Sequence, residues 1–286
     1  MSETAWSYMV RCADGSLYAG WTNDLARRLH AHKTGRGARY TKMRGGGAVR
    51  LAYSERCADK RAALRREAAL KRLTKPEKER LAAAWAAENA VCIRMAAPDD
   101  AAGVVALYNH YILEDTATFR LEPQTEADYR ALIAETLPIA PFLVAVRPAD
   151  GSVAGYASAH LWRGGMGGYA WDVETTIYCA PACMGQGVGR RLYAALLALL
   201  TAQGYHNAVA VLAYPNKESE AFHKAFGFVR FGLEPHCGYK FGRWLGVSYW
   251  QKNLQCDTDA APEPLRSPLP QETVDEALRT ANTPGQ

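Results

Sequence analysis

The sequence lacks any apolar run of the roughly 18 residues that a membrane-spanning helix needs. Its longest apolar stretch, residues 192–200, follows an amphipathic helical pattern. The first residues lack the basic and then apolar segments of a secretory leader. The seven cysteines include no Cys-x-x-Cys pair and have no partners at zinc spacing. These absences exclude a disulfide scaffold and predict a reduced, cytoplasmic chain with no membrane partner.

Acidic charge is scarce at the N-terminal end of the chain. Residues 1–90 hold 19 Lys and Arg against 9 Asp and Glu, whereas residues 91–254 hold 13 against 14. Residues 255–286 hold 2 against 6 and are rich in Pro, Thr and Gln. We therefore predict domains at 1–89 and 90–254 and a disordered acidic tail at 255–286. The basic first domain suggests a polyanionic partner such as nucleic acid.

The most informative segment is residues 173–192, which pass from a β-branched strand through a glycine-rich turn into an amphipathic helix. Gly185, Gly187 and Gly189 alternate in this turn. The free N–H groups at a helix N-terminus bind phosphate oxygens. The turn lacks the Lys-Ser/Thr pair of a P-loop, and it lacks the spacing and later acidic residue of a dinucleotide fold. We therefore expect a different phosphorylated cofactor.

The turn resembles the coenzyme A signature Gln/Arg-x-x-Gly-x-Gly/Ala of the GCN5-related N-acetyltransferases (GNAT), with Met184 at the Gln/Arg position. A second segment, Asn216 to Phe228, matches the family's Asn before a short helix that ends in Gly-Phe. Residues 108–112, 118–125, 171–176 and 238–244 resemble the phosphinothricin and methionine-sulfoximine acetyltransferase group. The resemblance covers residues 91–254.

This resemblance implies a mixed, mainly antiparallel sheet flanked by helices, and acetyl-CoA-dependent N-acetylation of a small amine. Glu174 would be the base, acting directly or through water. His223 would donate a proton to the departing thiolate or accept the amine proton instead. Phe119, Arg120 and Arg163 would meet the substrate. Homodimers are common in the family. The expected coenzyme-binding residues are Ile177, Cys179, Gly185, Gln186, Gly187, Val188, Gly189, Arg190 and Asn216.

Each role has a plainer alternative. Glu174 could be an exposed strand carboxylate, and His223 could be a helix histidine with its hydrogen bonds satisfied. The chain also differs from its nearest relatives at Met166, beside which they carry a basic residue, and at Gly246, where they carry Asp. These differences leave the identity of the amine open.

The first ninety residues predict three strands, at 6–12, 17–22 and 49–54, and helices at 23–34, 59–73 and 76–88. Their motifs resemble the GIY-YIG endonucleases, which implies a small three-stranded sheet with helices. Tyr8 is the first motif tyrosine and residues 17–20 are the second motif. Residues 37–41 match a loop that carries a further tyrosine, and the whole chain is therefore an α/β (α+β) protein.

By this resemblance, Glu67 would bind Mg²⁺ or Mn²⁺, and Tyr8 would activate the nucleophile. Arg28 and His32 are four residues apart and share a helix face. Arg28 would stabilise developing charge, while His32 would position water or phosphate. Tyr18 and Tyr40 complete the predicted catalytic set.

Here too plainer readings are open. Tyr8 and Tyr18 could be core aromatics, Arg28 could lie on a solvated helix face, and Glu67 could simply pair with Lys71.

The leading hypothesis is thus an N-acetyltransferase for a small amine, fused to a GIY-YIG domain that binds and cleaves DNA. Two alternatives remain. The chain could be primarily a DNA endonuclease with an accessory acetyltransferase domain. The basic domain could instead be a non-cleaving nucleic-acid tether on an acetyltransferase.

Overall fold

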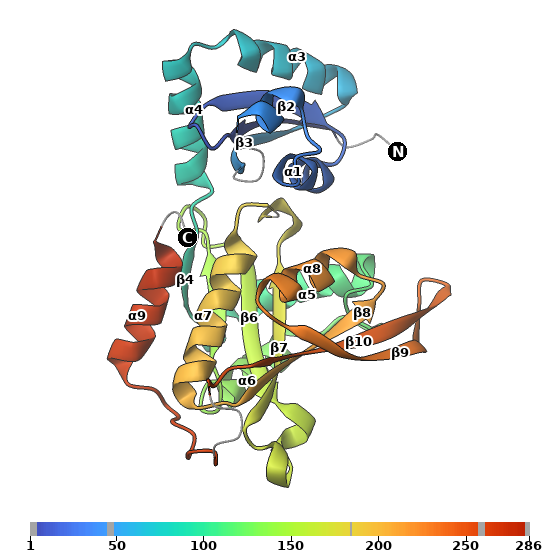
Figure 1. The fold of residues 1–286 in the computed structure, drawn as a ribbon, viewed down its shortest axis with the longest axis vertical. Coiled ribbons are helices and arrows are strands. Elements are labelled where there is room, and N and C mark those ends of the chain that lie inside the picture. The colour runs from blue at the N-terminus through green and yellow to red at the C-terminus, as the bar shows by residue number, and fades with distance from the viewer. Residues whose placement is uncertain (1–4, 45–48, 184, 257–260, 284–286) are drawn as a thin grey trace. The chain divides into compact units, whose positions relative to one another are not determined.

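The computed structural model describes residues 5–44, 49–183, 185–256 and 261–283. Met184, the departure from the coenzyme signature, lies outside these ranges. The chain forms two compact units, one built mainly from the residues up to Ala90 and one mainly from those after it (Figure 1). None of the helices in the described ranges is both long and apolar enough to cross a membrane.

The N-terminal unit is a three-stranded antiparallel sheet in the order β2-β1-β3. Helix α3 packs against β1 and β2, and α4 packs against β3. Asp24 and Asp59 cap α1 and α3 by accepting the N–H groups of Arg27 and Ala62. The predicted three-stranded fold with helices is confirmed. Its elements are β1 Ala5–Arg11, β2 Leu17–Thr22, α1 Leu25–Lys33, α2 Arg39–Met43, β3 Arg50–Cys57, α3 Lys60–Arg72 and α4 Lys75–Glu88.

The C-terminal unit is a seven-stranded sheet in the order β4-β5-β6-β7-β8-β10-β9. All neighbouring strands are antiparallel except β7 and β8, which run parallel. This confirms the predicted mixed, mainly antiparallel sheet. The strands are β4 Cys92–Met95, β5 Phe142–Val146, β6 Val153–Leu161, β7 Asp172–Cys179, β8 Asn207–Tyr214, β9 Val229–Lys240 and β10 Arg243–Asn253.

Helices cover both faces of this sheet, with α7 in front of it and α5 and α6 behind it in Figure 1. Phe142 and Val144 of β5 pack with α5 and α6 in one core. Leu143 and Ala145 are equally buried and, by strand alternation, point to the other face. The helices of the C-terminal unit are α5 Ala101–Glu114, α6 Glu126–Thr136, α7 Val188–Gln203, α8 Lys217–Ala225 and α9 Gln271–Asn282.

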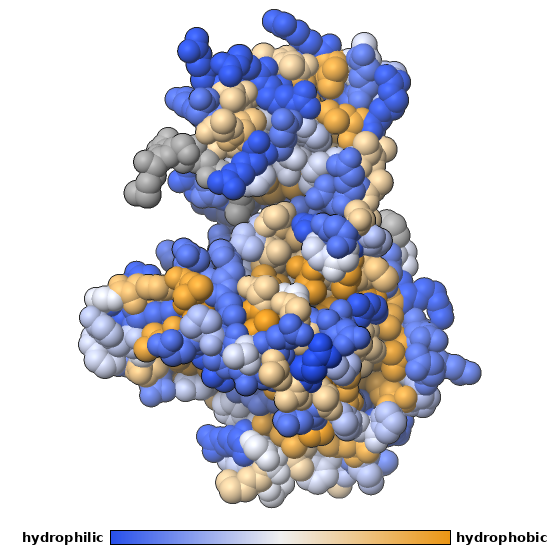
Figure 2. All heavy atoms as spheres, turned by 180° about the vertical axis from the view of Figure 1, so that it is seen from behind, coloured by the Kyte–Doolittle hydropathy of each residue, from blue (hydrophilic) through white to orange (hydrophobic). Residues whose placement is uncertain are grey.

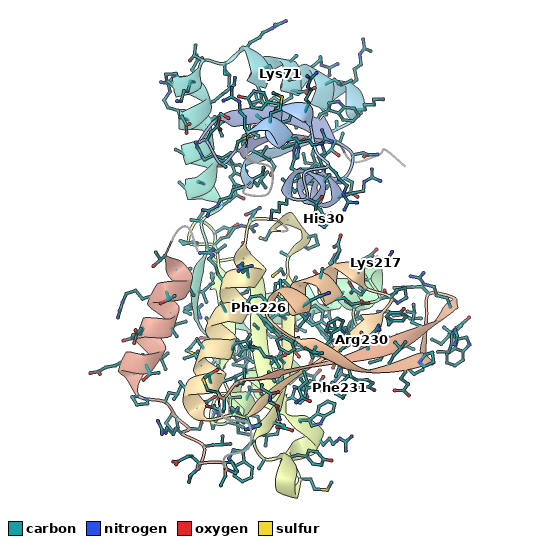
Figure 3. The ribbon with its side chains drawn as sticks, viewed as in Figure 1. His30, Lys71, Lys217, Phe226, Arg230 and Phe231 are labelled. Carbon is teal, nitrogen blue, oxygen red and sulfur yellow. The ribbon has the colours of Figure 1, made fainter. Side chains whose placement is uncertain are left out.

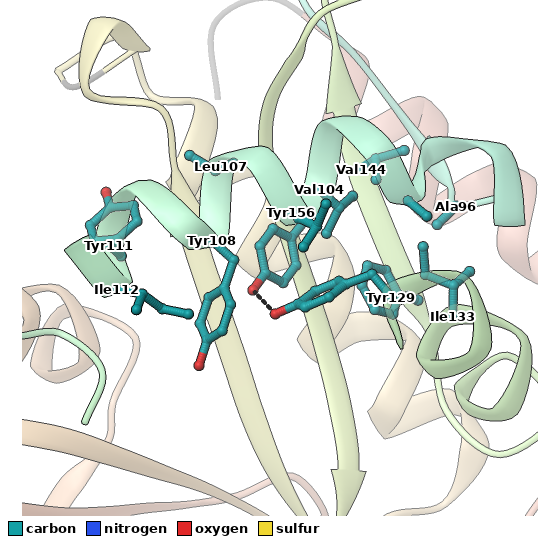
Figure 4. Packing of buried hydrophobic residues seen from close by; sticks show 13 residues of the cluster. Ala96, Val104, Leu107, Tyr108, Tyr111, Ile112, Tyr129, Ile133, Val144 and Tyr156 are labelled. Carbon is teal, nitrogen blue, oxygen red and sulfur yellow. Dashed lines mark hydrogen bonds between the residues drawn. The ribbon is translucent and has the colours of Figure 1, made fainter. Parts of the chain in front are cut away.

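The core behind the sheet is unusually rich in tyrosine (Figure 4). Tyr156 of β6 stacks on Phe142 with ring centroids 5.6 Å apart, and its hydroxyl lies 3.5 Å from that of Tyr129. The Tyr108 hydroxyl bonds to Thr118 Oγ1 at 2.9 Å. Buried tyrosines need such partners, because an unpaired hydroxyl is costly away from water. The contact between Tyr129 and Tyr156 joins α6 to β6 of the sheet, and the bond between Tyr108 and Thr118 joins α5 to the loop that follows it.

The prediction that 255–286 is disordered is wrong for much of this segment. Helix α9 packs on α7, and the Asn282 side chain bonds to both backbone groups of Ile93, at 2.7 and 2.8 Å. The Trp171 indole N–H donates to the Glu263 carbonyl at 2.8 Å. The acidic composition suggested disorder, but the segment also has an amphipathic pattern. The less exposed positions of α9 recur every three or four residues. These positions are Thr273, Val274, Ala277, Leu278, Ala281 and Asn282.

Candidate active sites

Strands β7 and β8 form a fork in the larger sheet. They pair only from Asp172 to Glu174, while β6 follows β7 as far as Cys179. Thr175 lies where they separate: its hydroxyl donates to the Val209 carbonyl at 3.0 Å and accepts from the Tyr193 hydroxyl at 2.7 Å. Beyond this point the edge of β7 that faces β8 has no strand partner. Unpaired strand edges bind extended ligands through backbone hydrogen bonds.

Ile177 and Cys179, the predicted coenzyme-binding residues of β7, lie along this open edge. The Cys179 carbonyl is already engaged, because it accepts the Tyr111 hydroxyl at 2.7 Å. A ligand lying in the fork would therefore run alongside Ile177 and pass the Cys179 carbonyl that Tyr111 already holds.

The glycine turn leads directly into α7. Gly185 and Gly187 have φ angles of 78° and 81°, which favour glycine, and α7 begins at Val188. Gly189 lies against β7, since a Cβ there would be 3.1 Å from the Cys179 sulfur. The predicted residues from Gly185 to Arg190 thus span the turn and the first residues of a 16-residue helix, where N–H groups have no partner within the helix. The Gln186 N–H of the turn donates to the Cys183 carbonyl. This geometry suits a pyrophosphate group.

The other two predicted coenzyme ligands are partly engaged elsewhere. The Asn216 side chain caps α8 by accepting the Ser219 N–H at 3.0 Å. The Arg190 guanidinium lies 5.7 Å from the centre of the Phe226 ring, which follows α8 (Figure 3). Arg190 and Arg191 also line a groove of about 480 Å³ between α7 and α9.

Glu174 lies at the base of the fork. Its carboxylate is 27% exposed and is 3.6 Å from the ring of His160, its cross-strand neighbour on β6. Tyr249 of β10 is close enough for the charge of Glu174 to affect its pKa. Burial raises the pKa of Tyr249, as do its hydrogen bond to Glu234 and the nearby charges, among them Glu174. Glu174 is therefore accessible, as a base must be.

His223 is a buried residue of α8. Its ring is 2% exposed and lies between the rings of Tyr193 and Phe228. Its Nδ1 donates to the Ser219 carbonyl at 2.8 Å, and burial lowers its pKa. A neutral imidazole with its proton on Nδ1 has only a lone pair on Nε2. As placed, His223 thus suits the predicted alternative of a proton acceptor better than that of a proton donor, and its role stays a prediction.

The predicted substrate residues come from two loops. The Phe119 ring packs on Gly238, where a Cβ would lie 2.7 Å from the ring. Arg120 is exposed in the same loop. Arg163 belongs to the turn after β6, where its guanidinium bonds to the Tyr169 hydroxyl at 2.9 Å and stacks on that ring. Arg163 is therefore held by an aromatic partner.

Lys240 is a residue that sequence reasoning missed. It is 3% exposed, and its ammonium donates to the carbonyls of Asp115 at 2.7 Å, Thr118 at 2.8 Å and Tyr111 at 3.3 Å. Burial lowers its pKa. The only signal was its place in residues 238–244. Lys240 fixes the loop that carries Phe119 and Arg120, and it caps the end of α5.

In the N-terminal unit, a directional hydrogen-bond chain joins three predicted residues. The Tyr8 hydroxyl accepts from Arg28 Nε at 2.9 Å and lies 2.8 Å from His32 Nε2. His32 Nδ1 lies 2.8 Å from Thr41 Oγ1, whose own proton goes to the Ala38 carbonyl. His32 must therefore donate through Nδ1 and accept the Tyr8 proton at Nε2. Burial and the Arg28 charge lower the pKa of His32 to about 4, so the ring is neutral.

Tyr8 is completely buried, and burial raises its pKa to about 12. Gly20 makes room for it, since a Cβ there would be 2.7 Å from its hydroxyl oxygen. The Tyr8 hydroxyl is therefore closed to solvent, with Arg28 and His32 as its hydrogen-bond partners.

The remaining predicted nuclease residues surround this chain. The Tyr18 ring stacks on Tyr40 at 5.6 Å and meets His32 edge-on at 5.7 Å. The Glu67 carboxylate is 14% exposed, contacts Lys71 at 2.8 Å and contributes to the raised pKa of Tyr8 (Figure 3). The structure thus brings all six predicted residues of this unit together.

Metal binding here would depend on Glu67. In the ranges that the structure describes, no three His, Cys, Asp or Glu side chains form a metal-binding group. One carboxylate with water and phosphate oxygens suits a hard cation such as Mg²⁺. The cation would have to displace Lys71, so the donor set fits a metal that arrives with its substrate.

Comparison with known proteins agrees with both geometries. Residues 93–247 match the family model for the acetyltransferase (GNAT) domain, and residues 4–80 match that for the GIY-YIG catalytic domain. The chain therefore belongs to the GNAT acetyltransferase family, with a GIY-YIG domain ahead of its N-acetyltransferase domain. Both resemblances predicted from the sequence are confirmed.

Individual relatives indicate which acetyltransferases of the family this chain is similar to. Phosphinothricin N-acetyltransferase of Streptomyces viridochromogenes is 37% identical over 174 residues, 61% of this chain and 92% of that protein. The L-methionine sulfoximine/L-methionine sulfone acetyltransferase of Salmonella typhimurium is 34% identical over 60% of this chain and 98% of its own length. A Sinorhizobium meliloti phosphinothricin acetyltransferase, solved with AcCoA, aligns with a TM-score of 0.57 and 32% identity over 60% of this chain and 93% of its own.

The lowered pKa of His32 predicts a pH-dependent stability of the N-terminal domain. The unfolded chain binds a proton near the ordinary histidine value of about 6.5, whereas the folded domain binds it only near 4. The contribution of His32 to the free energy of unfolding is therefore fully present above pH 6.5. It is lost, by on the order of 1–3 kcal/mol, as the pH drops towards 4. The melting temperature of His32→Asn, measured by thermal unfolding between pH 4 and 7, should lose this part of its dependence on pH. The exposed control His30→Gln should keep it, and equal slopes in the two variants would contradict the assignment.

Proposed function

We propose that the protein transfers the acetyl group of acetyl-CoA to the amino group of a small amino-acid analogue of the phosphinothricin or methionine sulfoximine/sulfone type. One observation carries this proposal: the fork between β7 and β8 ends at an accessible carboxylate and lies beside a glycine turn that starts a helix. The names of the relatives support the choice of substrate.

The residues of the fork divide the work. Bound acetyl-CoA supplies an activated thioester. The turn from Gly185 to Arg190 would hold the pyrophosphate, and the open edge at Ile177 and Cys179 would hold the pantetheine arm. Glu174 would take the proton that the amine must lose when it attacks. Phe119 and Arg120, on the loop that Lys240 fixes, would meet the rest of the substrate.

The proposal predicts that Glu174→Gln loses activity while it keeps acetyl-CoA. Glutamine is nearly isosteric with glutamate but cannot accept a proton, so kcat should fall about 10²- to 10⁴-fold. Thiol release from acetyl-CoA, with methionine sulfoximine, methionine sulfone and phosphinothricin as acceptors, measures this. The exposed Glu135→Gln variant on α6 is the matched control. Full activity in Glu174→Gln, or no turnover by the wild type with any of a panel of small amines, would refute the proposal.

We further propose that the GIY-YIG domain binds and cleaves DNA with Mg²⁺ or Mn²⁺. The specific observation in favour is the oriented chain from Arg28 through Tyr8 to His32, next to Glu67. His32 could take the Tyr8 proton, Arg28 could meet a phosphate, and Glu67 could hold the cation. The surplus of basic residues in 1–90 suits a phosphate backbone.

This proposal predicts metal-dependent nicking of plasmid or branched DNA that is lost in Glu67→Gln and on chelation. The exposed Glu88→Gln variant at the end of α4 is the control. DNA binding should survive in Glu67→Gln, because the substitution removes one negative charge. Binding without cleavage by the wild type would favour the tether instead, and cleavage that persists in Glu67→Gln would remove Glu67 from the site.

The partner of the acetyltransferase domain is proposed to be a second copy of the chain. Strand β9 is the sheet edge, and its exposed apolar residues follow the projecting β9–β10 hairpin (Figure 2). Exposed apolar surface of this kind marks interaction sites. The residues are Val229, Phe231, Leu233, Tyr239, Phe241 and Trp244. Sedimentation over a range of concentrations tests the proposal, and a monomer throughout would contradict it.

A further inference from the structure

Glu174 and His160 form a pair that the proposed reaction does not yet use. They are opposite each other on β7 and β6, so their side chains leave the same face of the sheet. Glu174 Oε2 and His160 Nε2 are 3.6 Å apart. The His160 side chain is 58% exposed, whereas that of Glu174 is 27% exposed. The imidazole is therefore the more exposed member of the pair, and it lies between the partly exposed carboxylate and solvent.

Other titratable groups near Glu174 come from the opposite side of the fork. Tyr249 of β10 donates its hydroxyl to Glu234 of β9, and Cys237 lies nearby on the same strand. The raised pKa of Tyr249 keeps its proton in place, and Glu234 brings a second negative charge. Among the residues that the structure describes, His160 is the basic side chain within ion-pair distance of Glu174.

We propose that His160 is a positioning residue that receives the reaction's proton from Glu174 and releases it to solvent. The inference rests on the proposed role of Glu174 as the base. As the amine attacks the thioester carbonyl, a C–N bond would form, the N–H bond of the amine would break and an O–H bond would form on Glu174. The C–S bond would break, and coenzyme A would leave as a thiolate that takes a proton from water. The proton on Glu174 then passes to His160 Nε2, which restores the carboxylate and leaves an imidazolium. The exposed imidazolium loses a ring proton to water, so the pair returns to its starting state.

The pair also predicts the direction in which activity changes with pH. Imidazole side chains change charge between about pH 5 and 8. A protonated imidazole cannot accept a proton from Glu174. Activity should therefore be lower at acidic pH, where an imidazole carries its second proton. A purely structural ion pair at such an exposed position would contribute little to stability and would give no pH profile of activity of this kind.

The test compares His160→Gln, His160→Ala and the exposed control His30→Gln (Figure 3) in the full chain. Steady-state kinetics are measured from pH 5 to 8.5 with acetyl-CoA and methionine sulfoximine, or with whichever panel amine the wild type turns over. Glutamine can still hydrogen-bond to Glu174 but cannot carry the proton. We expect kcat to fall about 10- to 100-fold in both His160 variants. KM should change less than about twofold, and the acidic limb should flatten. Free imidazole should partly restore kcat in His160→Ala, while His30→Gln keeps wild-type kinetics.

Three results would overturn the inference. One is wild-type kcat with an unchanged acidic limb in His160→Gln. Another is full rescue by glutamine of a defect seen with alanine, which would show a hydrogen-bonding role only. The third is loss of acetyl-CoA binding in both variants without imidazole rescue, which would show a structural role. Failure of the proposed function is separate, because it appears as undiminished activity in Glu174→Gln.

Discussion

The hydroxyl of Thr175 marks the point on which the larger domain depends. It bonds to the Val209 carbonyl and to Tyr193, and there the only parallel strand pair of the described sheet ends. Up to that point β7 and β8 are paired. Beyond it they separate and leave a slot lined by the backbone edges of the two strands. The slot has Glu174 at its closed end and the glycine turn of α7 near its open end. One local constraint therefore sets both where a coenzyme could lie and which carboxylate would face its reacting end.

Three histidines of the chain show how environment selects chemistry. His32 and His223 are buried, have lowered pKa values and direct Nδ1 at an oxygen atom, so each presents a lone pair at Nε2. For His32 that lone pair faces the Tyr8 hydroxyl, which suits proton acceptance. For His223 the same chemistry opposes the role of proton donor. His160 is exposed beside a carboxylate, where an imidazole can both accept and release a proton.

Much of this arrangement could be predicted because it is local in sequence. The glycine spacing predicted the start of α7, and the four-residue spacing placed Arg28 and His32 on one face of α1. The missed features are nonlocal. The pairing of His160 with Glu174 depends on strand register across 14 residues. The bonds of Lys240 reach back more than 120 residues, and those of Asn282 reach back 189. Neither composition nor periodicity records such contacts, and burial of His223 likewise depends on rings from α7 and from the segment after α8.

Acetyl-CoA is proposed to bind in the fork between β7 and β8. Amide hydrogen exchange of the full chain, with and without acetyl-CoA, tests this proposal without relying on turnover. We expect added protection to concentrate at residues 175–179 and 185–190. Saturating acetyl-CoA that protects other segments and leaves these two unchanged would contradict the account.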